Sequence, residues 1–478
     1  MNRGKKLLFD VLIFALSNFG SKVLVFLLVP LYTNTLSTEE YGIADLMTVT
    51  IHLLFPLLTV GITEATLRFL LDKDSKKERI LTISIAIIVI STLLLSFFLP
   101  LIKKIEQGFD NYGLYFLIMY FSSSLNTCFS NYTRGIDRTK VYAIKGVLYT
   151  VLMVALNILF LIVLKRGLEG YLLSIIVSDI FTVIYMIIAA KEYRYFKIEF
   201  DISLTKEMIK YSLPMIPTIL AWWVMQVSDK YIVIAFSGIA VSGIYAVSYK
   251  IPSILSLITT IFNQAWQISA VKSFEDYDYK DFFQKVYKVF FVGSIILSSI
   301  LILGSQILGK ILFAKDYYIA WLYVPFLVIA YLFSGLSGVM ASAFTTIKKT
   351  SVLFYSTLAG AIFNIVFNIV FVPKYGAMAA AITTMLGFLL TYIIREFCIR
   401  RKCGMKLTHM KEMLGLILIL AESIIMVMDY KWKYIVATFF LLLIIAMYYK
   451  TLFNTIRLLK SLVVKKLNLS KARKKFNN

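Results

Sequence analysis

Long apolar runs recur along this 478-residue chain, and they constrain its fold more than any other feature. A helix that crosses the hydrocarbon core of a bilayer needs about 20 mostly apolar residues. A transmembrane barrel strand needs only about 10 residues and alternates in polarity, which these runs do not. Hydrophobic residues make up 59% of the chain and charged residues 16%, whereas soluble domains are about 25% charged. The chain is therefore predicted to be an all-α membrane protein.

Fourteen transmembrane helices are predicted. The first run carries Asp10, Asn18 and Lys22 and lacks a small-residue cleavage site, so it is interpreted as a span rather than a signal peptide. The longest outer loop, 101–111, is too short to fold as a domain of its own. The predicted spans are 7–32, 42–70, 80–100, 112–133, 141–164, 168–190, 208–235, 241–268, 286–306, 317–345, 351–372, 376–394, 412–428 and 434–449.

The net charge of +23 indicates how these spans are oriented. If the amino terminus is cytoplasmic, the predicted cytoplasmic segments hold 38 of the 50 Lys and Arg residues, and the outer segments hold nine. Cytoplasmic loops of membrane proteins carry such an excess of basic residues. Both termini are therefore predicted to be cytoplasmic, and the basic tail 450–478 is expected to attract anionic lipid.

An internal repeat is suggested by two offsets. Gly42 falls on Gly243 at an offset of 201, and Asn157 falls on Asn368 at an offset of 211. Chance similarity between apolar helices is the alternative. A true repeat of six spans would give two parallel six-helix lobes, an architecture found in transporters.

The predicted domains follow from this repeat. They are an N-lobe (1–190, spans 1–6), a cytoplasmic linker (191–207), a C-lobe (208–394, spans 7–12), a cytoplasmic loop (395–411), two extra helices (412–449) and the basic tail (450–478).

Two blocks of sequence carry a family resemblance. The first is NTLSTEEYGIADLM with TVGITEATLRFL, within 34–70. The second is YSLPMIPTILAWWVMQVSDKYIVIAF, followed by SGIYAVSYKIPSIL and NQAWQISAVKSF, within 211–274. Through them the chain resembles the polysaccharide-exporting flippases of the MOP superfamily, the Wzx type.

The resemblance implies a MATE-like fold in a bacterial cytoplasmic membrane. It also implies movement of undecaprenyl-pyrophosphate-linked oligosaccharide from the inner to the outer leaflet. The expected partners are that lipid-linked substrate, membrane lipids and other glycan-assembly proteins, and no nucleic acid.

Basic residues deep in the spans are candidates for substrate binding. A lysine at the bilayer centre costs at least about 2.5–3.5 kcal/mol, so it is expected to have a function or a partner. Lys22, Lys230 and Lys250 are the deep bases, and they could bind pyrophosphate or pair with acids elsewhere. Arg68 lies four residues after Glu64, so the two could form an ion pair, or Arg68 could contact a head group.

Polar and acidic residues complete the predicted site. Asparagine and glutamine side chains could bond sugar hydroxyls or neighbouring helices. These are Asn263, Gln264, Asn364 and Asn368. The candidates for ion coupling or for counter-ions are Asp45, His52, Glu64, Asp179 and Asp229. Coupling to H⁺ or Na⁺ is expected, with no resident metal, cofactor or catalytic residue.

Three functions were compared. A lipid-linked oligosaccharide flippase working by alternating access is favoured. A cation or drug antiporter of the same superfamily is the first alternative, but Lys22 and Lys250 do not suit an acidic cavity. A membrane glycan polymerase or ligase is the second, but the chain lacks the large outer catalytic loop typical of such enzymes. The protein is therefore predicted not to be an enzyme.

Overall fold

The computed structural model describes residue 26 and residues 28–72, 75–105, 111–197, 199–272, 279–347 and 349–476. Within these residues every regular element is helical and there is no β-strand, so the all-α prediction is confirmed for this part of the chain. The described residues form two compact units. The N-terminal unit runs to Ala246 and includes Ala314–Tyr317, and the C-terminal unit comprises Val247–Phe313 and Tyr318–Asn478.

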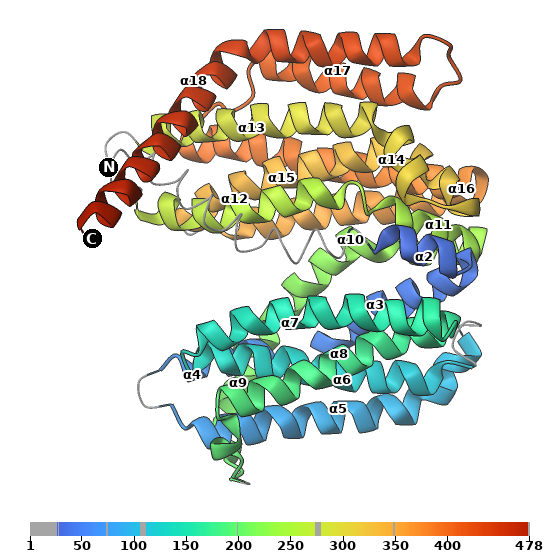
Figure 1. The fold of residues 1–478 in the computed structure, drawn as a ribbon, viewed down its shortest axis with the longest axis vertical. Helices are drawn as coiled ribbons and strands as arrows, with labels where there is room; N and C mark the ends of the chain where they lie inside the picture. Colours follow the sequence, from blue (N-terminus) through green and yellow to red (C-terminus); the bar gives the residue numbers. More distant parts are fainter. Residues whose placement is uncertain are drawn as a thin grey trace. The chain divides into compact units, whose positions relative to one another are not determined.

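The N-terminal unit is a helical bundle in which α5, α6, α7 and α8 run side by side (Figure 1). Its core contains the buried side chains of Met47, Phe116, Tyr120 and Leu172. Its helices are α2 (Val29–Thr35), α3 (Thr38–Leu58), α4 (Ile62–Leu70), α5 (Lys77–Ile105), α6 (Gly113–Gly135), α7 (Thr139–Asn157), α8 (Gly167–Ala189), α9 (Ile202–Ser212), α10 (Ile216–Ser237) and most of α11 (Ile239–Ser248).

The start and end of α3 follow from its sequence. Ser37 accepts a hydrogen bond from the backbone of Glu40, and the Glu40 carboxylate accepts one from the backbone of Ser37, which forms a capping box. The helix ends before Val60 and Gly61, which both have positive φ. The predicted span 42–70 was therefore wrong as a single helix, because this left-handed turn separates α3 from α4.

The C-terminal unit contains α12 (Ser253–Lys272), α13 (Tyr279–Leu303), α14 (Ser305–Leu312), α15 (Val324–Thr346), α16 (Ser351–Cys403), α17 (Met410–Val427) and α18 (Lys433–Phe476). The 53 residues of α16 are two helices joined at Gly376, whose φ of 58° is left-handed. The two halves fold back on each other, since Asn364 in the first half bonds Thr384 in the second.

Eight helices of the described residues are long and apolar enough to cross a membrane. Two bent pairs would bring the number to ten: 202–221 with 223–237, bent by 49°, and 239–248 with 253–263, bent by 50°. The predicted number was fourteen. Helices α6 and α17 are outside the set because polar residues lower the hydropathy of α6 and three charged residues lie in α17. Most of the first predicted span lies outside the described residues.

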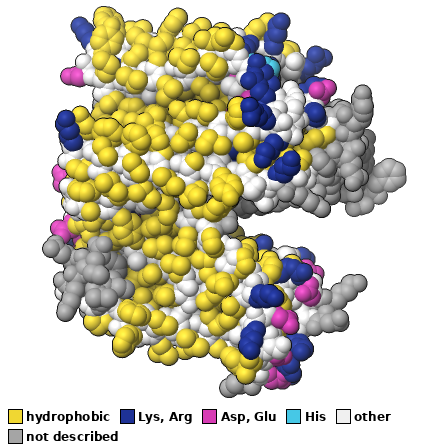
Figure 2. Space-filling view, turned by 180° about the vertical axis from the view of Figure 1, so that it is seen from behind, with side chains coloured by type: hydrophobic (Ala, Val, Ile, Leu, Met, Phe, Trp, Pro, Cys, Tyr) yellow, Lys and Arg dark blue, Asp and Glu magenta, His cyan; other side chains and the backbone are white. Residues whose placement is uncertain are grey.

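The surface of each unit, taken by itself, suits a membrane. Figure 2 shows hydrophobic side chains over the flank of each unit, with most of the visible Lys and Arg gathered toward one end. In the C-terminal unit, exposed basic residues near the end of α16 and the start of α17 include Arg400, Arg401, Lys402 and Lys411. A broad apolar surface with charge at one end is the pattern that a bilayer requires.

Features of the backbone recur at the offset of 211. Asn157 and Asn368 each donate a side-chain hydrogen bond to the carbonyl four residues earlier, at 2.6 and 2.8 Å. Lys165 and Gly376, also 211 apart, both have positive φ, 49° and 58°, at the turn after the helix. Two equivalent helix ends therefore share both a side-chain bond and a turn geometry.

Candidate functional site

A short, partly buried ion pair joins α3 and α10 in the N-terminal unit. The Lys230 Nζ lies 2.7 Å and 3.0 Å from the two carboxylate oxygens of Asp45. The side chains of Lys230 and Asp45 are only 11% and 20% exposed. Two charges so far removed from water stabilise one another, and the loss of either would leave the other without this contact.

The neighbouring acid, Asp229, has different partners. It is 2% exposed, and its Oδ2 accepts a hydrogen bond of 2.7 Å from the hydroxyl of Tyr245 in α11. Its Oδ1 accepts one from the backbone N–H of Lys230. Adjacent residues on a helix point about 100° apart. Accordingly, Asp229 bonds α11 whereas Lys230 bonds α3.

Two further polar contacts hold α10 against α3. The hydroxyls of Thr50 and Tyr231 are 2.6 Å apart, and the indole N–H of Trp223 donates to the carbonyl of Val49 at 3.0 Å. His52 is exposed on α3, where the charges of Lys230 and Asp45 act on it. We call the contact formed by Asp45, Lys230 and these hydrogen bonds the α3–α10 seam.

The predicted pairing of Glu64 with Arg68 is wrong. Arg68 forms its ion pair with Asp72, one helical turn further along, and both side chains are about half exposed. The spacing of four residues fits either partner, so the sequence could not distinguish them. Glu64 is exposed on α4.

Asp179 belongs to a buried polar cluster between α6 and α8. Its carboxylate accepts a hydrogen bond of 2.6 Å from the hydroxyl of Ser123. The amide of Asn126 donates to the carbonyl of Asp179 and to the hydroxyl of Thr182. The positive charge that acts on Asp179 is that of Lys145 in α7.

A second polar cluster lies in the C-terminal unit, between the two halves of α16. Asn364 donates to the hydroxyl of Thr384 at 3.1 Å, and Thr383 donates to Asn368 at 2.9 Å. All four side chains are buried. In the described chain these asparagines therefore bond neighbouring helices, the alternative that competed with sugar binding.

Lys250 lies where α11 breaks before α12. Residues 249–252 form turns between the two helices, which meet at an angle of 50° beside Pro252. Proline has no backbone N–H to donate, which accounts for the break in the helix here. Lys250 is half-buried. The bend places this lysine in a non-helical segment of backbone, where its direction is not tied to a helix face.

Asn263 lies near the middle of α12. Its side-chain oxygen is buried and has no hydrogen-bond partner among the described residues, and its amide nitrogen lies close to Gly338 of α15. Lys22 lies outside the described residues, as does the side chain of Gln264.

The structure therefore places the described candidates in two groups. Asp45, His52, Glu64, Arg68, Asp179, Asp229 and Lys230 lie in the N-terminal unit, and Lys250, Asn263, Asn364 and Asn368 lie in the C-terminal unit. Among these candidates, Asp45 pairs with Lys230, Asp229 accepts a hydrogen bond from the backbone N–H of Lys230, and Asn368 bonds the backbone of Asn364.

Some buried charged residues were not among the predicted site residues, and Arg395 and Glu192 are two of them. Arg395 of α16 is 2% exposed and donates to Ser356, Thr357 and the carbonyl of Ser337. Arg395 was predicted to lie at the start of the cytoplasmic loop 395–411, so it was not considered as a buried residue. In the structure α16 continues to Cys403, and Arg395 lies within this helix. Glu192 is fully buried just after α8, in the segment predicted to be the linker. A single acid in a charged segment has no distinguishing pattern.

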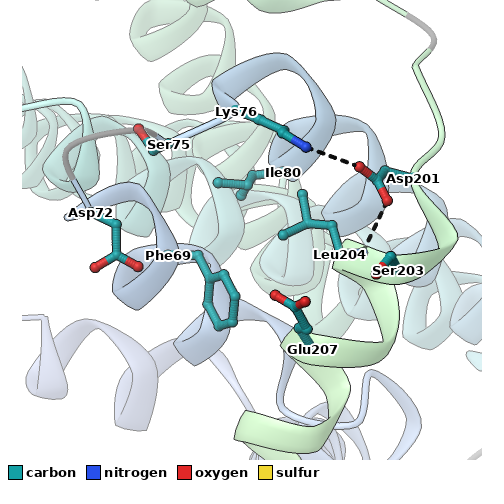
Figure 3. A pocket seen from close by; sticks show the side chains of 9 residues that line it. All are labelled: Phe69, Asp72, Ser75, Lys76, Ile80, Asp201, Ser203, Leu204 and Glu207. Carbon is teal, nitrogen blue, oxygen red and sulfur yellow. Dashed lines mark hydrogen bonds and ion pairs between the residues drawn. The ribbon is translucent and has the colours of Figure 1, made fainter.

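A pocket of about 210 Å³ opens beside this linker in the N-terminal unit (Figure 3). Asp201 forms its wall and accepts bonds from Lys76 and Arg79. Phe69, Ile80 and Leu204 give it an apolar side. Since Asp201 also caps α9, the ion pairs fasten the start of α9 to α5. No residue predicted to bind substrate lines this pocket.

Comparisons with known proteins agree on one superfamily of folds. The chain is similar to an inward-facing multidrug resistance MATE family transporter of the MOP superfamily, with a TM-score of 0.70 at 14% identity, over 80% of this chain and 94% of that one. It is similar to the lipid II flippase MurJ, with a TM-score of 0.69 at 16% identity, over 92% of this chain and 100% of that one.

A third similar structure is a MOP superfamily transporter from Pyrococcus furiosus, with a TM-score of 0.58 at 14% identity, over 84% of this chain and 96% of that one. At these identities the likeness shows the fold alone. No curated protein matches the sequence. The family model described as "Polysaccharide biosynthesis protein" matches residues 7–267, more than half of the chain. The resemblance found in the sequence is thereby confirmed, and the chain belongs to the polysaccharide biosynthesis protein family.

Proposed function

We propose that this protein moves undecaprenyl-pyrophosphate-linked oligosaccharide from the inner to the outer leaflet of a bacterial cytoplasmic membrane. Membership of the polysaccharide biosynthesis family is the observation that carries the proposal. The MOP fold, shared with a lipid II flippase, supports it. Glycan-assembly proteins that make or use this lipid-linked glycan are the expected partners.

The architecture proposed for this work has fourteen spans, with both termini in the cytoplasm. Because α16 is two helices, it would count as two crossings instead of one. That extra crossing, with α6, α17 and the first predicted span, would raise the ten crossings that include the bent pairs to fourteen. The gathering of Lys and Arg toward one end of each unit supports the orientation (Figure 2). The features shared at offsets of 201 and 211 support two parallel six-helix lobes.

Alternating access is the proposed mechanism. The pyrophosphate joins the lipid to the glycan and is strongly anionic, so ammonium groups in the membrane would attract it. Lys22, Lys230 and Lys250 are assigned this role, with Arg68 at the cytoplasmic entrance. Asn263, Gln264, Asn364 and Asn368 are assigned to the glycan. Lys230 would exchange Asp45 for the pyrophosphate, because a pyrophosphate diester carries two negative charges whereas a carboxylate carries one.

Coupling to H⁺ or Na⁺ is the proposed energy source. Asp179 is the preferred coupling residue, because its carboxylate is buried and accepts a hydrogen bond from the hydroxyl of Ser123, while Asn126 and Thr182 bond its backbone carbonyl. Asp45, His52, Glu64 and Asp229 are the other candidates. The antiporter alternative is favoured by the MATE-like fold alone. It would be distinguished by its substrate, a cation, which the lysines of the spans would repel.

Deletion of the gene tests the proposal directly. Lipid-linked glycan is expected to accumulate on the inner leaflet, and mass spectrometry of extracted lipids would identify it. Re-expression of the wild-type chain is the control and should clear the accumulated lipid. A deletion strain with normal surface glycan, no accumulated lipid and increased drug sensitivity would contradict flippase function and favour the antiporter.

A further inference from the structure

A buried carboxyl group without an ion-pair partner among the described residues lies at the start of the linker 191–207. Glu192 is fully buried in the short helical turn Glu192–Tyr195, which follows α8. Its Oε1 lies 2.6 Å from the hydroxyl oxygen of Thr133 in α6. Its Oε2 is buried without a hydrogen-bond partner among the described residues. The carboxyl group therefore has one hydrogen-bond partner among the described residues.

The single hydroxyl hydrogen of Thr133 decides which group donates in the contact between Thr133 and Glu192. The Thr133 oxygen also lies 2.7 Å from the carbonyl oxygen of Phe129. A hydroxyl carries a single hydrogen, so it cannot donate to both the Phe129 carbonyl and an ionised Glu192. A protonated Glu192 removes the conflict, because its O–H donates to Thr133 while Thr133 donates to Phe129.

In the part of the chain that the structure describes, the groups that face Glu192 supply no compensating positive charge. The titratable residues acting with it are Cys128 and Tyr132 of α6, and Tyr132 in turn is affected by Tyr195 and by Glu78 of α5. The Nζ of Lys77 in α5 lies over the ring of Tyr195, 5.7 Å from the ring centroid, in a cation–π contact. An ionised carboxylate here would be buried beside neutral groups, which is costly.

Aromatic contacts cover this carboxyl group. Phe129 and Tyr132 of α6 pack on Phe196 and Tyr195 of the linker, with ring centroids 6.2 and 6.1 Å apart. Further along, the linker is held to α5 by ion pairs of Arg79 with Glu199 and with the partly buried Asp201. Glu192 thus lies in the half of the linker that packs on α6.

We propose that Glu192 is a proton-binding site that fastens the start of the linker to α6 when it is protonated. Burial raises the pKa of Glu192 from 4.5 to about 7, despite the hydrogen bond from Thr133, which acts in the opposite direction. We call the linker closed when Glu192 is buried against α6, as in the structure, and open when Glu192 is exposed to water. The closed linker therefore binds the proton more tightly than the open linker does. Ionisation near neutral pH favours release, which makes the junction between the predicted lobes sensitive to cytoplasmic pH.

The sign of the effect follows from these two pKa values. Between pH 4.5 and 7 the closed form holds more protons than the open form, so its stability falls as the pH rises. Above pH 7 both forms are ionised and the effect levels off. The equilibrium for opening should increase about tenfold from pH 6 to pH 8.

Hydrogen–deuterium exchange of the full chain in lipid nanodiscs tests this site. The measured quantity is the exchange rate of residues 191–197 in the wild type divided by that in Glu192→Gln, at about pH 6 and about pH 8. Amide exchange is itself catalysed by base and speeds up with pH in both proteins, so dividing one rate by the other removes this common effect. The ratio is expected to rise about tenfold, because glutamine can donate to Thr133 at every pH. A ratio that stays constant would overturn the proposal.

Two matched variants keep the test decisive. Glu199→Gln changes an exposed linker acid and should retain the wild-type dependence on pH. Thr133→Val removes the acceptor of the Glu192 proton. At pH 6 the linker of this variant should exchange faster than that of the wild type. At pH 8 the difference between the two should be smaller. Exchange identical to the wild type at both values would also refute the site. Because no step requires transport, failure here would leave the flippase proposal intact.

Discussion

Gly42 of α3 and Gly243 of α11 meet where these two helices cross, and each lies against the backbone of the other helix. A Cβ atom on Gly42 would collide with the carbonyl of Ile239, and one on Gly243 would collide with the carbonyl of Thr38. Thr38 and Ile239 are themselves 201 residues apart, as are the glycines. The contact is therefore reciprocal, like that across a two-fold axis, and it joins the residues that first suggested a repeat.

Substituting either glycine with alanine should disrupt this crossing. The added methyl group has only backbone to displace, so Gly42→Ala or Gly243→Ala should destabilise the protein by about 1–3 kcal/mol. Thermal unfolding in detergent would measure the loss. Gly146→Ala in α7 is the matched control, because nothing lies within 4 Å of its Cβ position. A control that unfolds as early as the two test variants would contradict the role of close packing.

Removing one partner of the Lys230–Asp45 pair should cost more than removing both. Lys230→Met leaves Asp45 partly buried without its ammonium, with an expected loss of up to about 3 kcal/mol. The double variant Lys230→Met with Asp45→Leu should recover much of that stability, because no charge is left unpaired. A double-mutant cycle on unfolding in detergent would measure the coupling. Additive losses would show that the two charges do not stabilise each other.

The role proposed for Lys250 predicts loss of transport without loss of protein. Lys250→Ala should abolish export of the surface glycan while the level of the protein in membranes stays normal. Lys250→Arg should retain export in part, since it keeps the positive charge at the bend. Glycan export in the complemented deletion strain is the readout, and full activity of the alanine variant would exclude this lysine from the site. The same test applies to Lys22.

Arg395 should prove important for stability. Its guanidinium ties α15 to both halves of α16 through Ser337, Ser356 and Thr357. Arg395→Lys keeps the charge but cannot reach all three acceptors, so we expect a loss of about 2 kcal/mol in thermal unfolding. Arg400→Lys, an exposed position on the same helix, is the control. Equal stability of the two variants would contradict this assignment.

Individual residues show how far the sequence could predict the site. Asp229 and Lys230 are adjacent on a helix, and for that reason they point in different directions, toward Tyr245 and Asp45. The break between α11 and α12 likewise has a local cause, since Pro252 removes a backbone hydrogen bond. Arg68 was paired with the wrong acid, because Glu64 and Asp72 are both four residues away and only side-chain geometry distinguishes them.

By itself, the sequence determined that this is an all-helical membrane protein of the polysaccharide biosynthesis family, because apolar run length, loop charge and local motifs all act within short stretches of chain. Only the tertiary structure decided which charges have partners. Asp45 and Lys230 are 185 residues apart, and Thr133 and Glu192 are 59 apart, so no local pattern connects them. In a membrane, a buried charge depends on the group that packs against it, and the fold alone chooses that group.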